Sequence, residues 1–190
     1  MRARTTITVF FGATLLLGVA SRGSAQVRPL PEDTLEFHYE GRRSVWMALG
    51  QVTAMNGLVW GFDYLVQRKE VFEISPKTFA RNLGRVPEWD TNTFGVNQLM
   101  HPYNGALYYG AARAEGFGPL ASAAFTLVGS AQWEWLWETV TPSANDIYMT
   151  TLGGITLGES LGRLSAGIRR NRSGGLLGIG QGLLAGLLDP

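Results

Sequence analysis

Glycines that recur at every fourth position are the feature of this 190-residue sequence that most constrains its fold. They form two sets: Gly154, Gly158 and Gly162, then Gly174, Gly178, Gly182 and Gly186. Residues four apart lie on one face of an α-helix, and a glycine face lets another backbone approach closely, as in helices that pack in lipid. In water each such glycine costs about 1 kcal/mol relative to alanine. The spacing therefore predicts close helix packing, with a loose Gly-rich tail as the alternative for the second set.

The rest of the chain also favours helices, because no run alternates polar and apolar residues for long. Ser44 is a candidate N-cap for a mostly apolar helix to Val66, and Ser143 is another, with Asp146 three residues later. Pro102 suits the first position of a helix, so His101-Pro102 is expected to be a helix boundary. The expected helices cover 44–66, a short segment at 75–83, 102–115, 119–139, 143–168 and 174–188. The predicted fold class is an all-α compact bundle of about five helices, Gly-rich, close-packed and membrane-associated.

Composition excludes several functional classes. The chain has no Cys, so it has no disulfide, thiolate zinc site, iron–sulfur cluster, cysteine nucleophile or lipid-modified cysteine. Sixteen Lys and Arg against fifteen Asp and Glu give a net charge of +1, without the excess of basic residues that a nucleic-acid partner requires. Charged residues make up 16%, against about 25% in ordinary soluble domains, and glycine is unusually frequent at 25 residues. This composition indicates close backbone packing and a surface that touches something apolar.

The first 25 residues resemble a secretory signal peptide. Arg2 and Arg4 precede a short apolar run, and Gly23-Ser24-Ala25 supplies the small residues of a cleavage site before Gln26. The alternative is an uncleaved anchor, although the run is short for a membrane span. Cleavage would leave 13 basic and 15 acidic residues, a net charge of −2. The expected organisation is a signal peptide (1–25), an extended polar arm (26–43), a helical bundle (44–170) and a C-terminal Gly/Leu-rich helix (171–190).

A second stripe with four-residue spacing is polar and runs along the expected helix 119–139. It comprises Ser122, Thr126, Ser130, Glu134 and Glu138. Water-facing stripes usually carry Lys, Arg and Glu, whereas this one begins with small hydroxyls. We therefore expect it to face inward as a hydrogen-bonded seam.

Three tryptophans beside these acids, Trp133, Trp135 and Trp137, leave two interpretations open. Tryptophan at the end of an apolar helix is typical of a membrane interface, and it is equally typical of a packed core. The mean hydropathy of +0.03 is low for a protein with many membrane spans. We expect an exported bundle at a membrane boundary, in the periplasm or outer membrane, with a membrane or an outer-membrane protein as its partner.

The candidate functional residues are polar side chains concentrated in the second half of the chain. They are Asn97, His101, Arg113, Glu134, Glu138, Asp146 and Glu159. If the helices on either side of residues 116–119 form an antiparallel hairpin, His101 and Glu134 lie at the same level along the helix axes. We therefore prefer a His101–Glu134 pair to the alternative, in which Arg113 pairs with Glu134 or Glu138. Arg113 is then expected to meet Asp146 or Glu159.

Three functions are compatible with these residues. The first is structural: a buried ion-pair network that fixes helix register in an assembly or scaffold module without catalysis. The second is an envelope lipid or polymer hydrolase that uses His101 with Glu134 or Glu138. The third is a carboxylate/His metal-binding module, although the spacing matches no known metal motif. The first is preferred, with no catalytic residue, metal or cofactor assigned and any small-molecule ligand left open.

An ordered string of residues resembles one known family. The string is Asn97, His101-Pro102-Tyr103-x-Gly105, Tyr108-Tyr109, Ala112-Arg113, Gly116, Ser130, Trp133-Glu134, Glu138, Ser143, Asp146, Gly153-Gly154 and Gly158-Glu159. It is similar to the bacterial envelope family called domain of unknown function 3943, over roughly residues 44–188. The resemblance implies a signal peptide, this helical region and an envelope location. It implies no catalytic role, because the activity of the family is not established.

Overall fold

The structure is a computed structural model that describes residues 43–66 and 69–189. The expected signal peptide and nearly all of the expected polar arm lie outside the described residues. Within the described part, all regular secondary structure is helical, apart from one parallel bridge between Glu88 and Ser143. The fold is therefore an all-α compact bundle, as predicted.

The N-terminal helices begin where their capping residues predict. Helix α1 (Val45–Val66) follows Ser44, whose hydroxyl accepts a hydrogen bond from the Met47 amide at 3.2 Å. After α2 (Lys69–Phe72), helix α3 (Pro76–Leu83) begins with a capping box between Ser75 and Thr78. These hydrogen bonds satisfy backbone N–H groups that have no partner inside the helix. The predictions for 44–66 and 75–83 are confirmed.

The expected boundary at His101-Pro102 is wrong. A π-helical turn, η2 (Val96–Met100), leads without interruption into α4 (His101–Ala114). His101 keeps helical angles (φ −62°, ψ −49°) although a proline follows it, and its N–H bonds to the carbonyl of Val96, five residues back. The wider hydrogen bonding of a π turn carries the chain past the proline that would otherwise end the helix. His101 therefore lies inside a helix and not at its N-terminus.

The next two expected helices also contain π turns. Helix α5 (Pro119–Gln132) continues into η3 (Trp133–Trp137), and α6 (Ala144–Tyr148) continues through η4 (Met149–Gly153) into α7 (Gly154–Arg170). Ser143 caps α6 by accepting a hydrogen bond from the Asp146 amide at 3.2 Å, as its sequence position predicts. Helix α8 (Gly175–Leu188) closes the chain.

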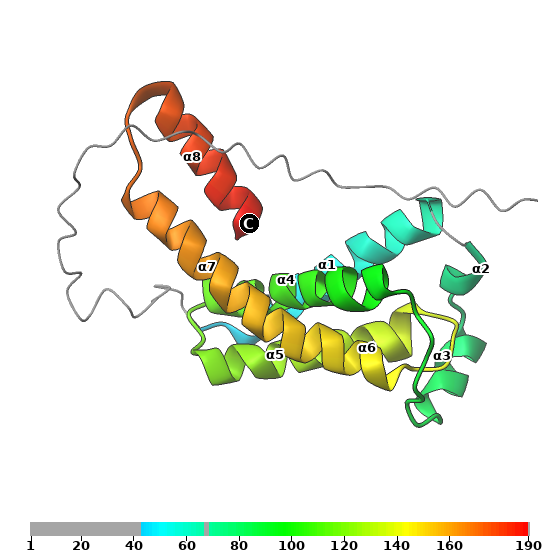
Figure 1. Cartoon of the computed structure of the whole chain (residues 1–190). Coiled ribbons are helices and arrows are strands. Elements are labelled where there is room, and N and C mark those ends of the chain that lie inside the picture. The colour runs from blue at the N-terminus through cyan, green and yellow to red at the C-terminus, as the bar shows by residue number, and fades with distance from the viewer. Residues whose placement is uncertain (1–42, 67–68, 190) are drawn as a thin grey trace, which may run out of the picture. The chain divides into compact units, whose positions relative to one another are not determined.

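Helix α4 is the centre of the bundle and packs against α1, α5 and α7 (Figure 1). The first glycine set makes the closest of these contacts possible. A Cβ atom on Gly154 would lie 2.4 Å from the Gly105 backbone, and one on Gly158 would lie 2.9 Å from the Tyr109 ring. Gly162 is buried on the same helix. The prediction of a helix–helix contact is confirmed for Gly154 and Gly158, and Gly162 is buried as that prediction requires.

The second glycine set does not behave in the same way. Helix α8 packs mainly on α7, through buried Ala185 and Gly178. A Cβ atom on Gly174 or Gly186 would meet nothing within 4 Å, and one on Gly182 would meet the Arg172 guanidinium. A Cβ atom on Gly178 would overlap the carbonyl of Ser173, which belongs to the connection between α7 and α8. The expectation that the second glycine set packs against another helix is therefore wrong, because its members face this connection or open space.

Apolar and polar side chains are distributed unusually between the interior and the surface. Among the described residues ten hydrophobic side chains are buried, half of them alanines, while fourteen polar or charged side chains are buried. Thirty large hydrophobic side chains are exposed in the same part of the chain, Trp46 to 82%. None of the described helices combines the length and the apolar character needed to cross a membrane. The interior is small and polar, and large apolar side chains lie outside.

Candidate functional site: a buried polar network

The network forms where the loop before α4 meets the start of α6. Glu88 and Ala144 hold the two segments together, since the Ala144 amide donates to the Glu88 carbonyl at 2.8 Å and the Glu88 amide donates to the Pro142 carbonyl at 2.9 Å. This pairing places the loop 88–93, which leads into η2, beside the capped N-terminus of α6. Side chains from α4, from this loop and from α6 then converge.

His101 and Asp146 form the charged centre of the network. His101 Nε2 lies 3.3 Å from Asp146 Oδ2, and His101 Nδ1 lies 3.1 Å from the Thr150 hydroxyl. All three side chains are buried. The expected His101–Glu134 pair is wrong, because both ring nitrogens of His101 already have these other partners. The continuous helix from 94 to 114 turns the imidazole toward α6 and η4.

Amides and a second carboxylate surround Asp146. Asn92 Nδ2 donates to Asp146 Oδ2 at 2.8 Å and to Asp90 Oδ2 at 2.6 Å. Asn145 Nδ2 reaches Asp90 Oδ1 at 2.5 Å, Asp146 Oδ1 at 3.2 Å and Asn97 Oδ1 at 3.3 Å. Asn97 is thereby connected to Asp146 through Asn145. The donors from asparagine offset part of the cost of burying carboxylates.

Glu134 lies on the π turn η3, Glu138 is the extended residue that follows it, and the two acids have separate partners. Glu134 is fully buried, and its Oε2 accepts the Ser143 amide at 2.7 Å. Burial, with the nearby Glu138 charge, raises the pKa of Glu134 well above its usual value. Glu138 Oε1 accepts from Trp133 Nε1 at 2.8 Å, and burial raises the pKa of Glu138 to about 7. These two acids border the His101 centre without contacting the imidazole directly.

A second polar cluster lies along the contact between α4 and α7. Arg113 Nε is 3.6 Å from Glu159 Oε2, which confirms one of the two partners predicted for Arg113. The Tyr109 hydroxyl donates to the same oxygen at 2.7 Å, and Arg163 contacts Glu159 Oε1 at 2.7 Å. Burial and the hydrogen bond to Glu159 raise the pKa of Tyr109. The seven predicted residues therefore divide between two clusters.

The polar stripe of α5 faces inward, as predicted. Ser122, Thr126 and Ser130 are fully buried. The Thr126 hydroxyl donates to the Ser122 carbonyl at 2.9 Å, and the Ser122 hydroxyl reaches the Phe117 carbonyl at 3.4 Å. Trp133 is buried too, so the core interpretation applies to this tryptophan.

Sequence reasoning missed several members of the interior. Asn56 on α1 is fully buried and accepts a hydrogen bond from the Tyr108 hydroxyl, while its Nδ2 donates to the Gly129 carbonyl at 3.1 Å. Asn145 and Thr150 are central to the network around His101. The one usable signal was Asn56 itself, since an amide within an apolar helix needs a buried partner.

The centre of the network is buried, but its edge reaches the surface, since Asn92 is exposed and Asp90 and Asn97 are half-buried. Two shallow surface depressions lie elsewhere: one between α4, α7 and the end of α8 beside Tyr103 and Gly110, and one along α1 beside Trp46 and Trp137. Neither is lined by His101, Asp146 or Glu134. Within residues 43–66 and 69–189, no group of three or more His, Asp and Glu side chains is arranged so that it could hold a metal ion. Chemically, the network is suited to joining helices through mutual hydrogen bonds.

These features define the class of protein: an all-α bundle in which polar side chains join closely packed helices. The sequence profile of the family described as domain of unknown function (DUF3943) matches residues 86–190, more than half of the chain. The chain belongs to this family. The match begins later than the resemblance over 44–188 suggested, and it includes both polar clusters, α7 and α8. No curated protein and no solved structure matches the chain.

Proposed function

We propose that this chain is a non-catalytic helical module of the bacterial cell envelope that lies at a membrane boundary and has an assembly or scaffold role. The observation that carries the proposal is the inverted distribution of side chains: the largest fully buried ones include Glu134 and Asn56, while Leu65 and Trp46 are each 82% exposed. A surface so rich in large apolar side chains is typical of a protein that contacts lipid or another protein. Small residues and polar contacts inside are typical of helices that associate where the hydrophobic effect contributes little.

The polar network has a structural role in this proposal. His101, Asp146 and Thr150 connect α4 to α6 and η4, and Ser143 connects α6 to Glu134 on η3. Each contact has a defined geometry, so a helix that slid along its neighbour would leave buried polar groups without partners. Such a penalty fixes helix register.

The location follows from the expected export. A signal peptide cut between Ala25 and Gln26 would deliver the chain to the periplasm, where its exposed apolar side chains would meet a membrane or an outer-membrane protein. The partner is therefore a membrane or a membrane protein.

Fractionation of the envelope tests the proposal. Cells that express the chain are broken, and the membrane pellet is washed with high salt and then with alkaline carbonate. We expect the chain in the membrane pellet after the salt wash, with an intact mass that starts at Gln26. A soluble periplasmic protein in the same lysate is the control. Recovery of the chain with that control before any wash would contradict the proposal.

One observation favours a second candidate, an envelope hydrolase that uses His101 with Glu138. A His–Asp pair lies near a carboxyl group whose pKa of about 7 suits proton transfer near neutral pH. A His101→Asn variant discriminates between the two. Each variant is expressed in a strain from which the gene for the chain is deleted. If the role is structural, the variant restores envelope integrity to the extent that it keeps its thermal stability. If the role is catalytic, a variant that folds normally still fails to restore integrity.

A further inference from the structure

We infer that the surface around Trp89 and Tyr148 binds a glycan strand of the cell wall, a chain of linked N-acetylhexosamine rings. We call this surface the aromatic platform and define it by Trp89, Tyr148, Asp90 and Asn92. It combines two exposed aromatic rings with the exposed edge of the buried polar network. The inference goes beyond the proposed function by adding the cell wall to the membrane as a partner, and it depends on that proposal only for the envelope location.

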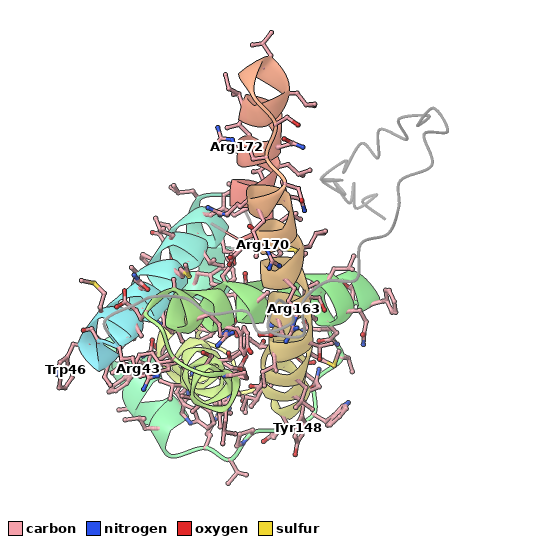
Figure 2. The ribbon with its side chains drawn as sticks, turned by 90° about the vertical axis from the view of Figure 1, so that its left-hand side faces the viewer. Arg43, Trp46, Tyr148, Arg163, Arg170 and Arg172 are labelled. Atoms are coloured by element: carbon pink, nitrogen blue, oxygen red, sulfur yellow. The ribbon has the colours of Figure 1, made fainter. Side chains whose placement is uncertain are left out.

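The two rings of the platform lie next to each other and face solvent. Trp89 is 75% exposed and Tyr148 is 58% exposed, and their ring centroids are 6.5 Å apart with 41° between the planes. Figure 2 shows Tyr148 projecting away from the bundle. In the other ring pairs of residues 43–66 and 69–189, at least one ring is half-buried or buried.

Such a pair of rings suits the flat side of a sugar. The face of an aromatic ring is apolar and slightly negative. The C–H groups on the face of a pyranose are apolar and slightly positive, so the two faces stack. Two adjoining rings therefore provide a surface along which a chain of pyranoses can lie.

The backbone fixes the platform in place. On one side of Trp89, Glu88 forms two backbone hydrogen bonds with the residues around the start of α6. On the other side, the Asp90 amide donates to Asn145 Oδ1 at 2.8 Å. Tyr148 lies on α6 itself. Both rings are thus held by the same short helix, and a surface that is ordered in advance loses little conformational entropy when it binds.

The polar edge of the platform offers acceptors. Asn92 is exposed, and its Nδ2 donates to Asp90 Oδ2 at 2.6 Å and to Asp146 Oδ2 at 2.8 Å. These two bonds use both N–H groups of the amide, so Asn92 presents its Oδ1 to a ligand. The half-buried Asp90 adds a carboxylate, which only accepts when it is ionised. A ligand that meets this edge must therefore donate hydrogen bonds.

This requirement favours a glycan over the other partners that the envelope contains. The hydroxyl and acetamido N–H groups of an N-acetylhexosamine are donors, and they surround the apolar faces of its ring. A lipid phosphate accepts hydrogen bonds and is repelled by Asp90 and Asp146. At protein interfaces aromatic residues are frequent but aspartate is depleted. A glycan strand matches both the rings and the acceptors beside them.

Co-sedimentation with purified peptidoglycan sacculi and calorimetry with the hexamer of β-1,4-linked N-acetylglucosamine test the inference on the exported chain. We expect the chain to sediment with the sacculi and to bind the hexamer. Trp89→Ala should weaken binding of the hexamer about ten-fold, and Tyr148→Ala should also weaken it. Trp46→Ala is the matched control, because it removes a tryptophan that is 82% exposed on a different part of the molecule (Figure 2). It should bind like the unchanged chain.

A second pair of variants tests the polar edge. Asn92→Ala removes the exposed acceptor and should weaken binding of the hexamer about five-fold. Asn171→Ala, which removes an exposed asparagine at the end of α7, is its control and should leave binding unchanged. Thermal unfolding of all variants verifies that they are folded.

The outcomes separate the inference from the proposed function. The inference is wrong if the chain binds neither sacculi nor hexamer, or if Trp89→Ala and Trp46→Ala bind alike. It is also wrong if Trp89→Ala lowers binding to phosphatidylglycerol vesicles and leaves binding to sacculi unchanged, because the platform then faces lipid. Recovery of the chain with the soluble control of the envelope fractionation would contradict the proposed function, and the measurements with sacculi and hexamer would still decide the inference.

Discussion

The two glycine stripes of this protein have the same spacing but different surroundings. On α7, Gly154 meets the Gly105 backbone so closely that a Cβ atom would lie 2.4 Å away. On α8, Gly186 has nothing within 4 Å of where its Cβ would be. Four-residue spacing therefore identifies a helix face but does not say what lies against it.

The difference arises from what holds each helix in place. Contacts on both sides of the glycine face hold α7 to α4: the His101–Asp146 pair through α6, and the Arg113–Glu159 pair further along. Helix α8 follows a connection rich in arginine and packs mainly on a single helix, so its remaining faces stay open.

The largest effect expected from this comparison is that of Gly154→Ala. A methyl group there overlaps backbone atoms of Gly105, which cannot move unless the helices separate, so we expect a loss of about 3 kcal/mol or more in the free energy of unfolding. Gly158→Leu, which meets the Tyr109 ring, should cost about 1–3 kcal/mol. Chemical unfolding followed by circular dichroism measures both changes. An unchanged midpoint for Gly154→Ala would show that the two helices are not in contact.

A second, smaller effect is that the stability of the bundle depends on pH, whereas that of α8 does not. Burial raises the pKa of Glu138 from 4.5 to about 7, so the folded state holds this proton more tightly than the unfolded chain. The resulting stability is complete below pH 4.5 and is lost as the pH rises from there through 7, by on the order of 2 kcal/mol. Urea unfolding at pH 5 and pH 8 gives the free energies of unfolding of the unchanged chain and of Glu138→Gln. The difference between the two proteins at each pH measures this loss of stability.

Helix α8 provides the internal control for that measurement. Residues 175–188 include no titratable side chain, so the free energy of local opening of α8, measured by hydrogen exchange, should not vary over the same pH range. If α8 and the bundle respond to pH equally, the two regions are not distinguished by their buried acids.

The third effect is a coupling between His101 and Asp146. The two side chains are 3.3 Å apart and buried. In a double-mutant cycle, the losses in free energy of unfolding caused by His101→Ala and by Asp146→Asn should therefore depart from additivity by about 1–2 kcal/mol. The cycle of His101→Ala with Glu134→Gln should be closer to additive, since Glu134 pairs with the Ser143 amide. Strong coupling to Glu134 and none to Asp146 would reverse the assignment of partners.

The smallest effect is expected at the open stripe. Gly186→Ala adds a methyl group to free space and removes a flexible residue from a helix, so it should stabilise α8 by about 0.5–1 kcal/mol. Hydrogen exchange of the α8 amides measures the free energy of local unfolding of this helix. A loss of stability would mean that Gly186 faces a neighbour, and the contrast between the two stripes would disappear.

The sequence was most informative where a local chemical requirement decided the outcome. Ser44 and Ser143 cap the helices that follow them, and the polar stripe of α5 is buried. It was least informative about partners. His101 was assigned to Glu134 because a straight helix starting at Pro102 places them at one height, whereas the π turn before His101 turns the ring toward Asp146.

By itself, the sequence determined the all-α class, the helix faces on which the glycines lie and the polar character of the interior, because helix periodicity, capping and the cost of buried charge act over a few residues. Only the tertiary structure decided which glycine stripe is buried, which acid meets His101 and where the chain passes a proline without a break. Those outcomes depend on contacts between residues 40 to 60 positions apart, such as His101 with Asp146 and Thr150. The free energies of such contacts depend on how two helices are placed relative to each other, and residue spacing within one helix does not determine that placement.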